Sequence, residues 1–364
     1  MRIAVFVSGC LKQGLDTALP GESRFGQQLS RMLGEAGHEV DAISGTHYDR
    51  PSWGNATVVP NVNLVYTFRR DVEYDLALYS PWEHQFNDPK VWEPCTTNPI
   101  DARHHLHITF GWGDSIGSTH TCYNNNHHLA FPYVQDAKDF PTDKLKNPYK
   151  TFPLPMPIYK ELAPINLPLR KNILWSTKDV FNPEWPEGHH VLRIGAATLR
   201  AISKLRKKHD FITTFLSTRF FDPMLSRWAK HYDVMGLVKS IPDSRCHALL
   251  PRDVLMNIMS TSRITTIVSG LLGSFGESIA SGSVPLCYMG HLYRDAADKH
   301  GIKLHTFDAT EEEIYNCIER LYEDNDFYLS VLADYREELR YYSFAKSYEY
   351  FEAMCRELGL NTKV

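Results

Sequence analysis

The residues best suited to chemistry lie in one segment of the chain, from Ser269 to Cys287. It reads Ser-Gly-Leu-Leu-Gly-Ser-Phe-Gly-Glu-Ser-Ile-Ala-Ser-Gly-Ser-Val-Pro-Leu-Cys. We expect a glycine-rich turn, a short helix that carries Glu277, and a buried strand from Val284 to Tyr288. Glycines let the backbone approach a phosphate closely, and a helix N-terminus favours negative charge. The segment therefore predicts a diphosphate site formed by Gly273, Ser274, Phe275, Gly276 and Glu277. Alternatively, the glycines only turn and cap a strand-loop-helix unit.

Two residues elsewhere could act at a reacting centre. The stretch His-Ile-Thr-Phe-Gly-Trp-Gly-Asp, from His107 to Asp114, reads as a strand that enters a turn ending in an acid. Asp114 could orient a nucleophile or take its proton, or it could cap the next turn. Lys178 follows a predicted strand from Asn172 to Trp175. It could balance charge on a leaving diphosphate, or it could be a solvated loop lysine.

The remaining polar groups carry weaker signals. The loop after the first predicted strand contains Gly9, which could close over phosphates or an acceptor, because ligands bind at this end of open α/β sheets. Adjacent histidines on a strand point to opposite faces, and their spacing matches no metal-ligand pattern. These histidines are His104, His105, His107, His120, His127 and His128. Helix capping explains Asp324-Asn325-Asp326, so we expect no metal and no cofactor.

Composition limits the class of protein. The 364 residues are 43% hydrophobic and 23% charged, which suits two globular domains. A formal net charge of −4 gives no global attraction to nucleic acid. Four cations end one predicted helix, where they suit the helix dipole or could touch a DNA backbone: Lys204, Arg206, Lys207 and Lys208. Seven scattered cysteines favour reduced thiols, and we expect neither a signal peptide nor a membrane span, hence a cytoplasmic protein.

Hydrophobic periodicity predicts two α/β domains joined by a proline-rich segment between Pro153 and Pro168. We place the first domain at 1–167, the second at 168–340, and a helical tail at 341–364 that packs at the domain junction. The first domain has expected strands at 1–7, 39–43, 63–68, 76–79, 107–110 and 129–133. The second has expected strands at 172–175, 211–216, 233–237, 264–268, 284–288 and 303–307, and expected helices at 191–207, 223–231, 252–259 and 311–322.

The order of elements in the second half resembles the donor domain of retaining GT-B glycosyltransferases. The resemblance rests on the glycine-rich segment with Glu277, on Gly236 as a strand-glycine turn beside the nucleotide base, and on Lys178 beside the donor phosphates. It implies two Rossmann-like domains with a C-terminal helix that crosses back. Glu277 matches the second acid of the family's pair, whereas the first falls at Ser269. That departure puts the sugar and the retention of configuration in doubt.

The resemblance implies a glycosyltransferase that uses a nucleotide-diphosphate sugar, such as a UDP-sugar, with Asp114 and Lys178 as catalytic residues. The arrangement also looks similar to phage α-glucosyltransferases that modify hydroxymethylated cytosines in DNA. A glycan or small-molecule acceptor remains an equal alternative. Two other functions stay open: a nucleotide-sugar 2-epimerase, and a catalytically degenerate binding module.

Overall fold

The computed structural model divides the chain into two compact units. The first comprises Met1–Lys160 and Tyr341–Val364, and the second comprises Glu161–Arg340. The residues that the structure describes are 1–7, 21–44, 59–65, 69, 71–80, 100–108, 127–132, 137–138, 148–176, 190–216, 234–247, 250, 252–267, 272–287, 294–302 and 309–362.

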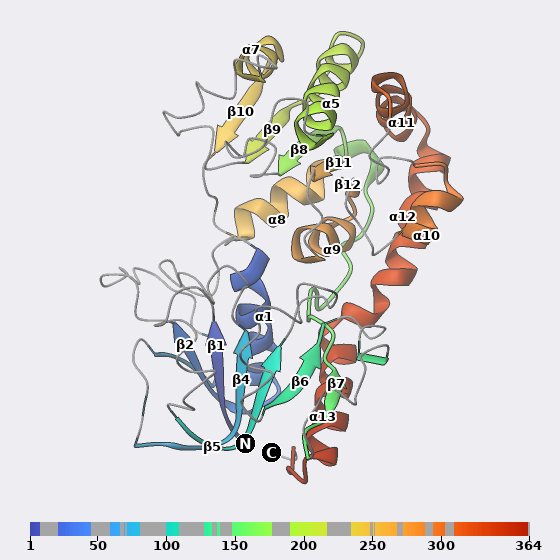
Figure 1. Cartoon of the computed structure of the whole chain (residues 1–364). Coiled ribbons are helices and arrows are strands. Elements are labelled where there is room, and N and C mark those ends of the chain that lie inside the picture. The colour runs from blue at the N-terminus through green and yellow to red at the C-terminus, as the bar shows by residue number, and fades with distance from the viewer. Residues whose placement is uncertain are drawn as a thin grey trace. The chain divides into compact units, whose positions relative to one another are not determined.

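The first unit contains a seven-stranded parallel sheet with the strand order β3-β2-β1-β4-β5-β6-β7 (Figure 1). Ile3, Ala4 and Val5 are consecutive and fully buried, as expected for a strand covered on both faces. The order reverses beside β1, which is the doubly wound pattern of Rossmann-like sheets. The strands are β1 (Arg2–Val7), β2 (Glu39–Ser44), β3 (Val62–Val65), β4 (Glu73–Ser80), β5 (Asp101–Ile108), β6 (His128–Phe131) and β7 (Thr151–Pro153).

The second unit repeats this pattern with a five-stranded parallel sheet of order β10-β9-β8-β11-β12. Its strands are β8 (Asn172–Ser176), β9 (Thr213–Leu216), β10 (Ser244–His247), β11 (Ser262–Ile267) and β12 (Val284–Cys287). Its helices are α5 (His190–Arg206), α7 (Val234–Ser240), α8 (Arg252–Thr261), α9 (Leu272–Ser281), α10 (Arg294–Lys299), α11 (Glu311–Glu323) and α12 (Asn325–Leu339), with the 3-10 turn η4 (Leu167–Leu169).

The chain's last residues return to the first unit. After α12, a 3-10 turn η8 (Arg340–Tyr342) leads to α13 (Phe344–Glu357), which packs against α1 (Gly21–Glu35) and β7. The Ser343 side chain accepts a hydrogen bond from the Lys346 N–H and caps α13. The buried His38 ring lies beside Tyr348, with 2.9 Å between Nε2 and the hydroxyl oxygen. These contacts fix the helical tail to the first unit.

Most expected helices and strands are confirmed, but one expected strand is wrong, another begins earlier than expected, and two observed strands were not predicted. The expected strand at 233–237 is helical, because α7 spans this range as far as it is described. The strand expected at 107–110 begins much earlier, at Asp101. Strands β7 and β10 were not expected, since each is short and β10 shows partly exposed residues. The expected helix at 223–231 and strand at 303–307 lie outside the described residues.

Candidate functional site

The residues expected to bind a diphosphate all lie in α9. Gly273 and Gly276 were expected in a turn before the helix, but both have helical backbone in its first half. The first N–H groups of a helix have no acceptor within it, and a glycine there leaves them uncovered by a Cβ atom. The first turn of α9, which contains Gly273, therefore has N–H groups without acceptors inside the helix, while both glycines are buried. Residues 268–271, which precede it, lie outside the described residues.

Glu277 is buried inside the second unit. Its relative exposure is 3%, and its neighbours Gly276 and Ser278 are buried as well. The alternative of a solvated surface helix residue is therefore wrong. Burial of a carboxylate is costly unless it is paired or hydrogen-bonded. Glu277 remains the strongest candidate for a functional acid in this unit.

Sheet topology explains where α9 begins. In the second unit the strand order reverses between β8 and β11, which pair in parallel with Thr266 opposite Trp175. Open α/β sheets bind ligands at the carboxyl ends of the strands beside such a reversal. The sequence continues from β11 into the segment before α9, and from β8 towards Lys178, two positions after the end of that strand. Lys178 itself lies outside the described residues.

The other predicted site residues divide into two groups. Asp114 and Gly9 lie outside the described residues, so their roles stay predictions. Gly236 lies in α7, which removes the strand-glycine turn on which its contact with a nucleotide base depended.

The histidines of the first unit form part of its core. The rings of Tyr79, His105 and His127 stack, with centroids 5.2 to 5.9 Å apart. Tyr79 and His105 are also joined by a 2.8 Å hydrogen bond between the hydroxyl oxygen and Nδ1. Burial lowers the pKa of His127 to about 3 and that of His128 to about 4. Among the residues with described side chains, no three His, Cys, Asp or Glu groups come together as metal ligands would.

Two further polar clusters have structural roles. The Asp324 carboxylate accepts a hydrogen bond from the Phe327 N–H at 2.9 Å and caps α12, which confirms the capping interpretation. In the basic cluster, Lys208 Nζ lies 2.5 Å from a Glu319 carboxylate oxygen. Arg206 pairs with Asp210 and Asp243 at 2.8 and 2.7 Å, and Lys204 lies over the Tyr315 ring.

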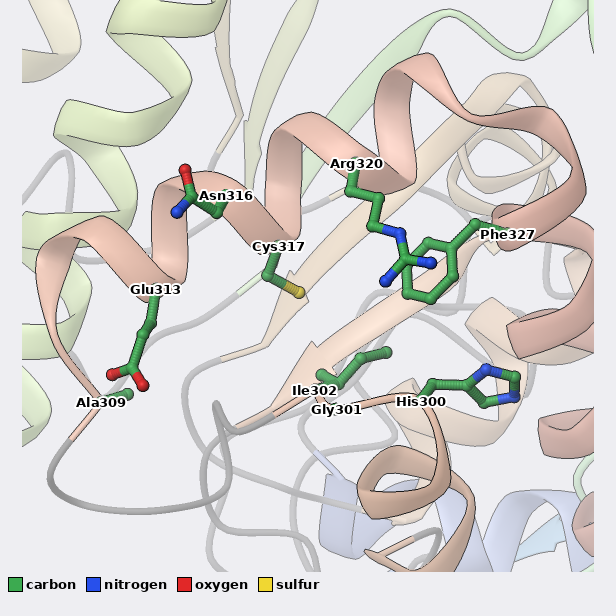
Figure 2. Close-up of a pocket in the computed structure, with 9 residues that line it drawn as sticks. All are labelled: His300, Gly301, Ile302, Ala309, Glu313, Asn316, Cys317, Arg320 and Phe327. Atoms are coloured by element: carbon green, nitrogen blue, oxygen red, sulfur yellow. The ribbon is translucent and has the colours of Figure 1, made fainter.

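A cavity of about 230 Å³ lies elsewhere in the second unit (Figure 2). It is lined by His300, Gly301, Ile302, Ala309, Glu313, Asn316, Cys317, Arg320 and Phe327. The Arg320 guanidinium lies over the Phe327 ring, 3.7 Å from the centroid, and His300 Nε2 lies 2.6 Å from an Asp334 oxygen. Glu313 completes a capping box with Thr310. None of the predicted site residues lines this cavity, and three of its polar groups already make structural contacts.

Two arginines that no sequence pattern singles out contact the C-terminal end of α9. Arg170, with a relative exposure of 2%, donates a 2.6 Å hydrogen bond to the Ser281 carbonyl oxygen. Arg336 donates to the carbonyl oxygens of Ile279 and Ala280. Neither arginine belongs to a motif, so only the three-dimensional structure relates them to α9.

No protein-family model matches the chain, and no curated protein sequence matches it. Solved structures do match over nearly the whole length. Sucrose-phosphate synthase from Thermosynechococcus elongatus has 13% identity and a TM-score of 0.61, covering 98% of this chain and 99% of its own. A candidate UDP-N-acetylglucosamine 2-epimerase from Listeria monocytogenes has 10% identity and a TM-score of 0.61, covering 98% and 96%. A trehalose-6-phosphate structure from E. coli bound with UDP-2-fluoro glucose has 12% identity and a TM-score of 0.55, covering 100% and 99%.

At such identities the likeness defines the fold and leaves the activity open. The two parallel sheets, their reversed strand orders and the tail that returns to the first unit agree with it. No helix among the described residues is both long enough and apolar enough to cross a membrane. The expected fold class is confirmed: the chain has the GT-B fold, with two Rossmann-like α/β units.

Proposed function

We propose that the protein is a glycosyltransferase that moves a sugar from a nucleotide-diphosphate sugar, such as a UDP-sugar, to an acceptor hydroxyl. The observation that carries the proposal is the position of α9. This helix follows β11 beside the strand-order reversal, places two glycines in its N-terminal half, and buries Glu277 one turn further on. Backbone N–H groups at such a helix start suit a diphosphate.

The proposed roles follow from position in the sequence and from the fold. Gly273, Ser274, Phe275, Gly276 and Glu277 bind the donor, the first four near the diphosphate and Glu277 at the ribose. Two of the compared structures are named with a UDP-sugar, which supports a uridine nucleotide as the first donor to test.

The chemical step is assigned to residues that follow strands at their carboxyl ends. Lys178 stabilises the leaving diphosphate, and Asp114 acts at the acceptor hydroxyl or at the sugar. Gly9 closes over the phosphates, and transfer proceeds with retention and without a metal.

A glycan or small molecule is the better supported acceptor. Binding of duplex DNA requires cations that are available to phosphates. In the basic cluster at the end of α5, Arg206 and Lys208 face carboxylates instead, and Lys204 faces an aromatic ring. A modified base in DNA remains the second acceptor to test.

Release of nucleotide tests the proposal directly. The protein is incubated with UDP-glucose, with and without a panel of glycan, small-molecule and hydroxymethylated-DNA acceptors, and free UDP is measured. A glycosyltransferase releases UDP faster with its acceptor and slowly by hydrolysis without one. A thermal-shift measurement accompanies it, since UDP at 100 times its dissociation constant stabilises a native protein by about 2.7 kcal/mol. Binding of a UDP-sugar with neither release of UDP nor epimerisation at C2 would identify a binding module.

The epimerase is the second candidate because one matched structure, at a TM-score of 0.61, is named as a candidate 2-epimerase. Proton NMR of UDP-N-acetylglucosamine with the protein alone separates the two. An epimerase produces the C2 epimer without an acceptor, whereas a transferase leaves the configuration at C2 unchanged.

A further inference from the structure

The C-terminal end of α9 is held by groups from two other parts of the second unit. The last carbonyl groups of a helix have no donors within it. Here the Ser281 carbonyl oxygen accepts from Arg170 Nη2 at 2.6 Å, and the Ala280 carbonyl oxygen accepts from the Ala163 N–H at 2.8 Å. The Gly282 carbonyl oxygen accepts from the Tyr328 hydroxyl. The segment before β8 and helix α12 therefore both donate hydrogen bonds to the backbone at the C-terminal end of α9.

Arg170 is an unusual side chain for this position. Its guanidinium also donates to the carbonyl oxygens of Ser262 and Pro164, both at 3.3 Å. Among the described residues no carboxylate pairs with it, and burial lowers its pKa. A cation is favoured at a helix C-terminus, where the carbonyl dipoles point outward. Backbone carbonyl groups at the end of α9 and beside it thus serve as the hydrogen-bond acceptors that a carboxylate would otherwise provide for the Arg170 guanidinium.

Gly282 allows the backbone after α9 to lie close to the Arg170 guanidinium. Its φ of +86° lies in the left-handed region, which glycine adopts without strain. A Cβ atom at this position would overlap the guanidinium, 2.7 Å from Cζ of Arg170. The turn after α9 is therefore shaped to bring its carbonyl groups to Arg170.

Contacts from other segments matter for α9 because two glycines lower the intrinsic stability of its N-terminal half. Gly273 and Gly276 each lower helix stability by about 1 kcal/mol relative to alanine. A helix of this length extends about 15 Å, so fixing one end orients the other. Phe275 adds a contact with Tyr335 of α12, with ring centroids 5.9 Å apart. The arrangement combines a glycine-containing N-terminal half with an anchored C-terminal half.

We propose that Arg170 is a positioning residue of the donor site: with Arg336 and Tyr328 it anchors the end of α9 and so sets where Gly273 to Glu277 meet the donor. The proposal rests on the proposed function. Arg170 acts through the helix and does not touch the donor itself.

Arg170→Met removes the hydrogen bonds with little change of volume, and Arg170→Lys keeps the charge. Arg263 provides the matched control. It is 4% exposed, burial lowers its pKa, and it donates to the carbonyl oxygens of Leu321 and Asp324 at 2.6 and 3.2 Å. It also lies over the Tyr328 ring, so any effect that passes through Tyr328 is present in Arg263→Met as well.

Two measurements are made on the full-length protein. Hydrogen exchange at residues 273–281 should be at least about tenfold faster in Arg170→Met, because a lost charge-assisted hydrogen bond corresponds to such a factor. Isothermal titration with UDP should show a dissociation constant about tenfold higher. Arg170→Lys should partly restore the slow exchange and the UDP affinity. Arg263→Met should change the exchange rate and the dissociation constant by no more than about twofold.

Wild-type exchange in α9 together with wild-type UDP affinity in a folded Arg170→Met would overturn the proposal, as would equal effects in Arg263→Met. If Arg170→Met does not fold, Arg170→Lys carries the same comparison. Absence of UDP binding by the wild-type protein refutes the proposed function and the donor role of the anchor, while the exchange measurement still decides whether Arg170 holds α9.

Discussion

Three buried histidines should make the first unit sensitive to mild acid. Burial lowers the pKa of His127 to about 3 and the pKa values of His38 and His128 to about 4, from 6.5. All three have relative exposures of 9% or less. Their rings stay neutral in the native protein and gain protons after unfolding. The free energy of unfolding therefore has its full value above pH 6.5 and falls as the pH drops from 6.5 towards 4.

The size of the fall follows from these values. At pH 5, which is about 1.5 pH units below the ordinary value, each histidine lowers the free energy of unfolding by about 2 kcal/mol. The three together lower it by about 6 kcal/mol, which is comparable with the whole stability of an ordinary domain. Most carboxylates are still ionised at this pH, so the histidines dominate the window between pH 5 and 7.

Urea unfolding followed by circular dichroism from pH 7.5 to 5.0 measures this effect, with hydrogen exchange to locate it. The midpoint should fall by about 2 M, and exchange should accelerate first in β5, β6 and α13. His38→Gln should remove about a third of the fall. The control His209→Gln changes a ring that is 30% exposed in the second unit and should leave the fall intact. A midpoint that is the same at pH 5.0 and 7.5 would refute the reasoning.

Four further predictions concern the reacting centre, metal independence and the turn after α9. Asp114→Asn should lower turnover by about a hundredfold or more without loss of folding if the carboxylate acts at the reacting centre, whereas a helix cap would tolerate Asn, and normal turnover would assign Asp114 to structure. Lys178→Ala should lower kcat more than it raises the donor KM, and an effect on KM alone would exclude a role at the leaving group. Transfer should continue in EDTA, and loss of activity that manganese or magnesium restores would contradict the metal-independent mechanism. Gly282→Ala should destabilise the second unit by at least about 1 kcal/mol in urea unfolding, because a left-handed backbone conformation and an overlap with Arg170 combine there, and an unchanged midpoint would be inconsistent with that geometry.

The sequence was most informative where periodicity and length were unambiguous. Helices α5, α8 and α11 were expected close to their observed bounds, because each has an apolar stripe over several turns. Gly236 shows the opposite case. The run from Asp233 to Leu237 is apolar enough for a buried strand, yet its described residues are helical, and a run of this length does not distinguish the two by pattern.

The candidate site was predictable only in part. Spacing singled out Glu277 and its glycines as candidates, while a structural turn and cap remained an alternative explanation for the glycines. Burial of Glu277 and the helical state of Gly273 could not be read from the pattern. Arg170 was also not predictable, since its partners are backbone carbonyl groups, which any sequence supplies and which leave no compositional trace.

The two ends of α9 have different surroundings: glycines lie in its first half, and buried Arg170 and half-buried Arg336 contact its last carbonyl groups. A diphosphate site needs uncovered N–H groups, which favours glycine and weakens the helix that presents them. A weak helix end can be kept in place only by strong contacts elsewhere, and charge-assisted hydrogen bonds to its last carbonyl groups are the strongest available to the backbone. Arg170 supplies such a bond to Ser281 at 2.6 Å, and Arg336 adds longer ones to Ile279 and Ala280 at 3.4 and 3.5 Å. If α9 binds the donor as proposed, mutations at either end of this helix should have correlated effects on donor affinity.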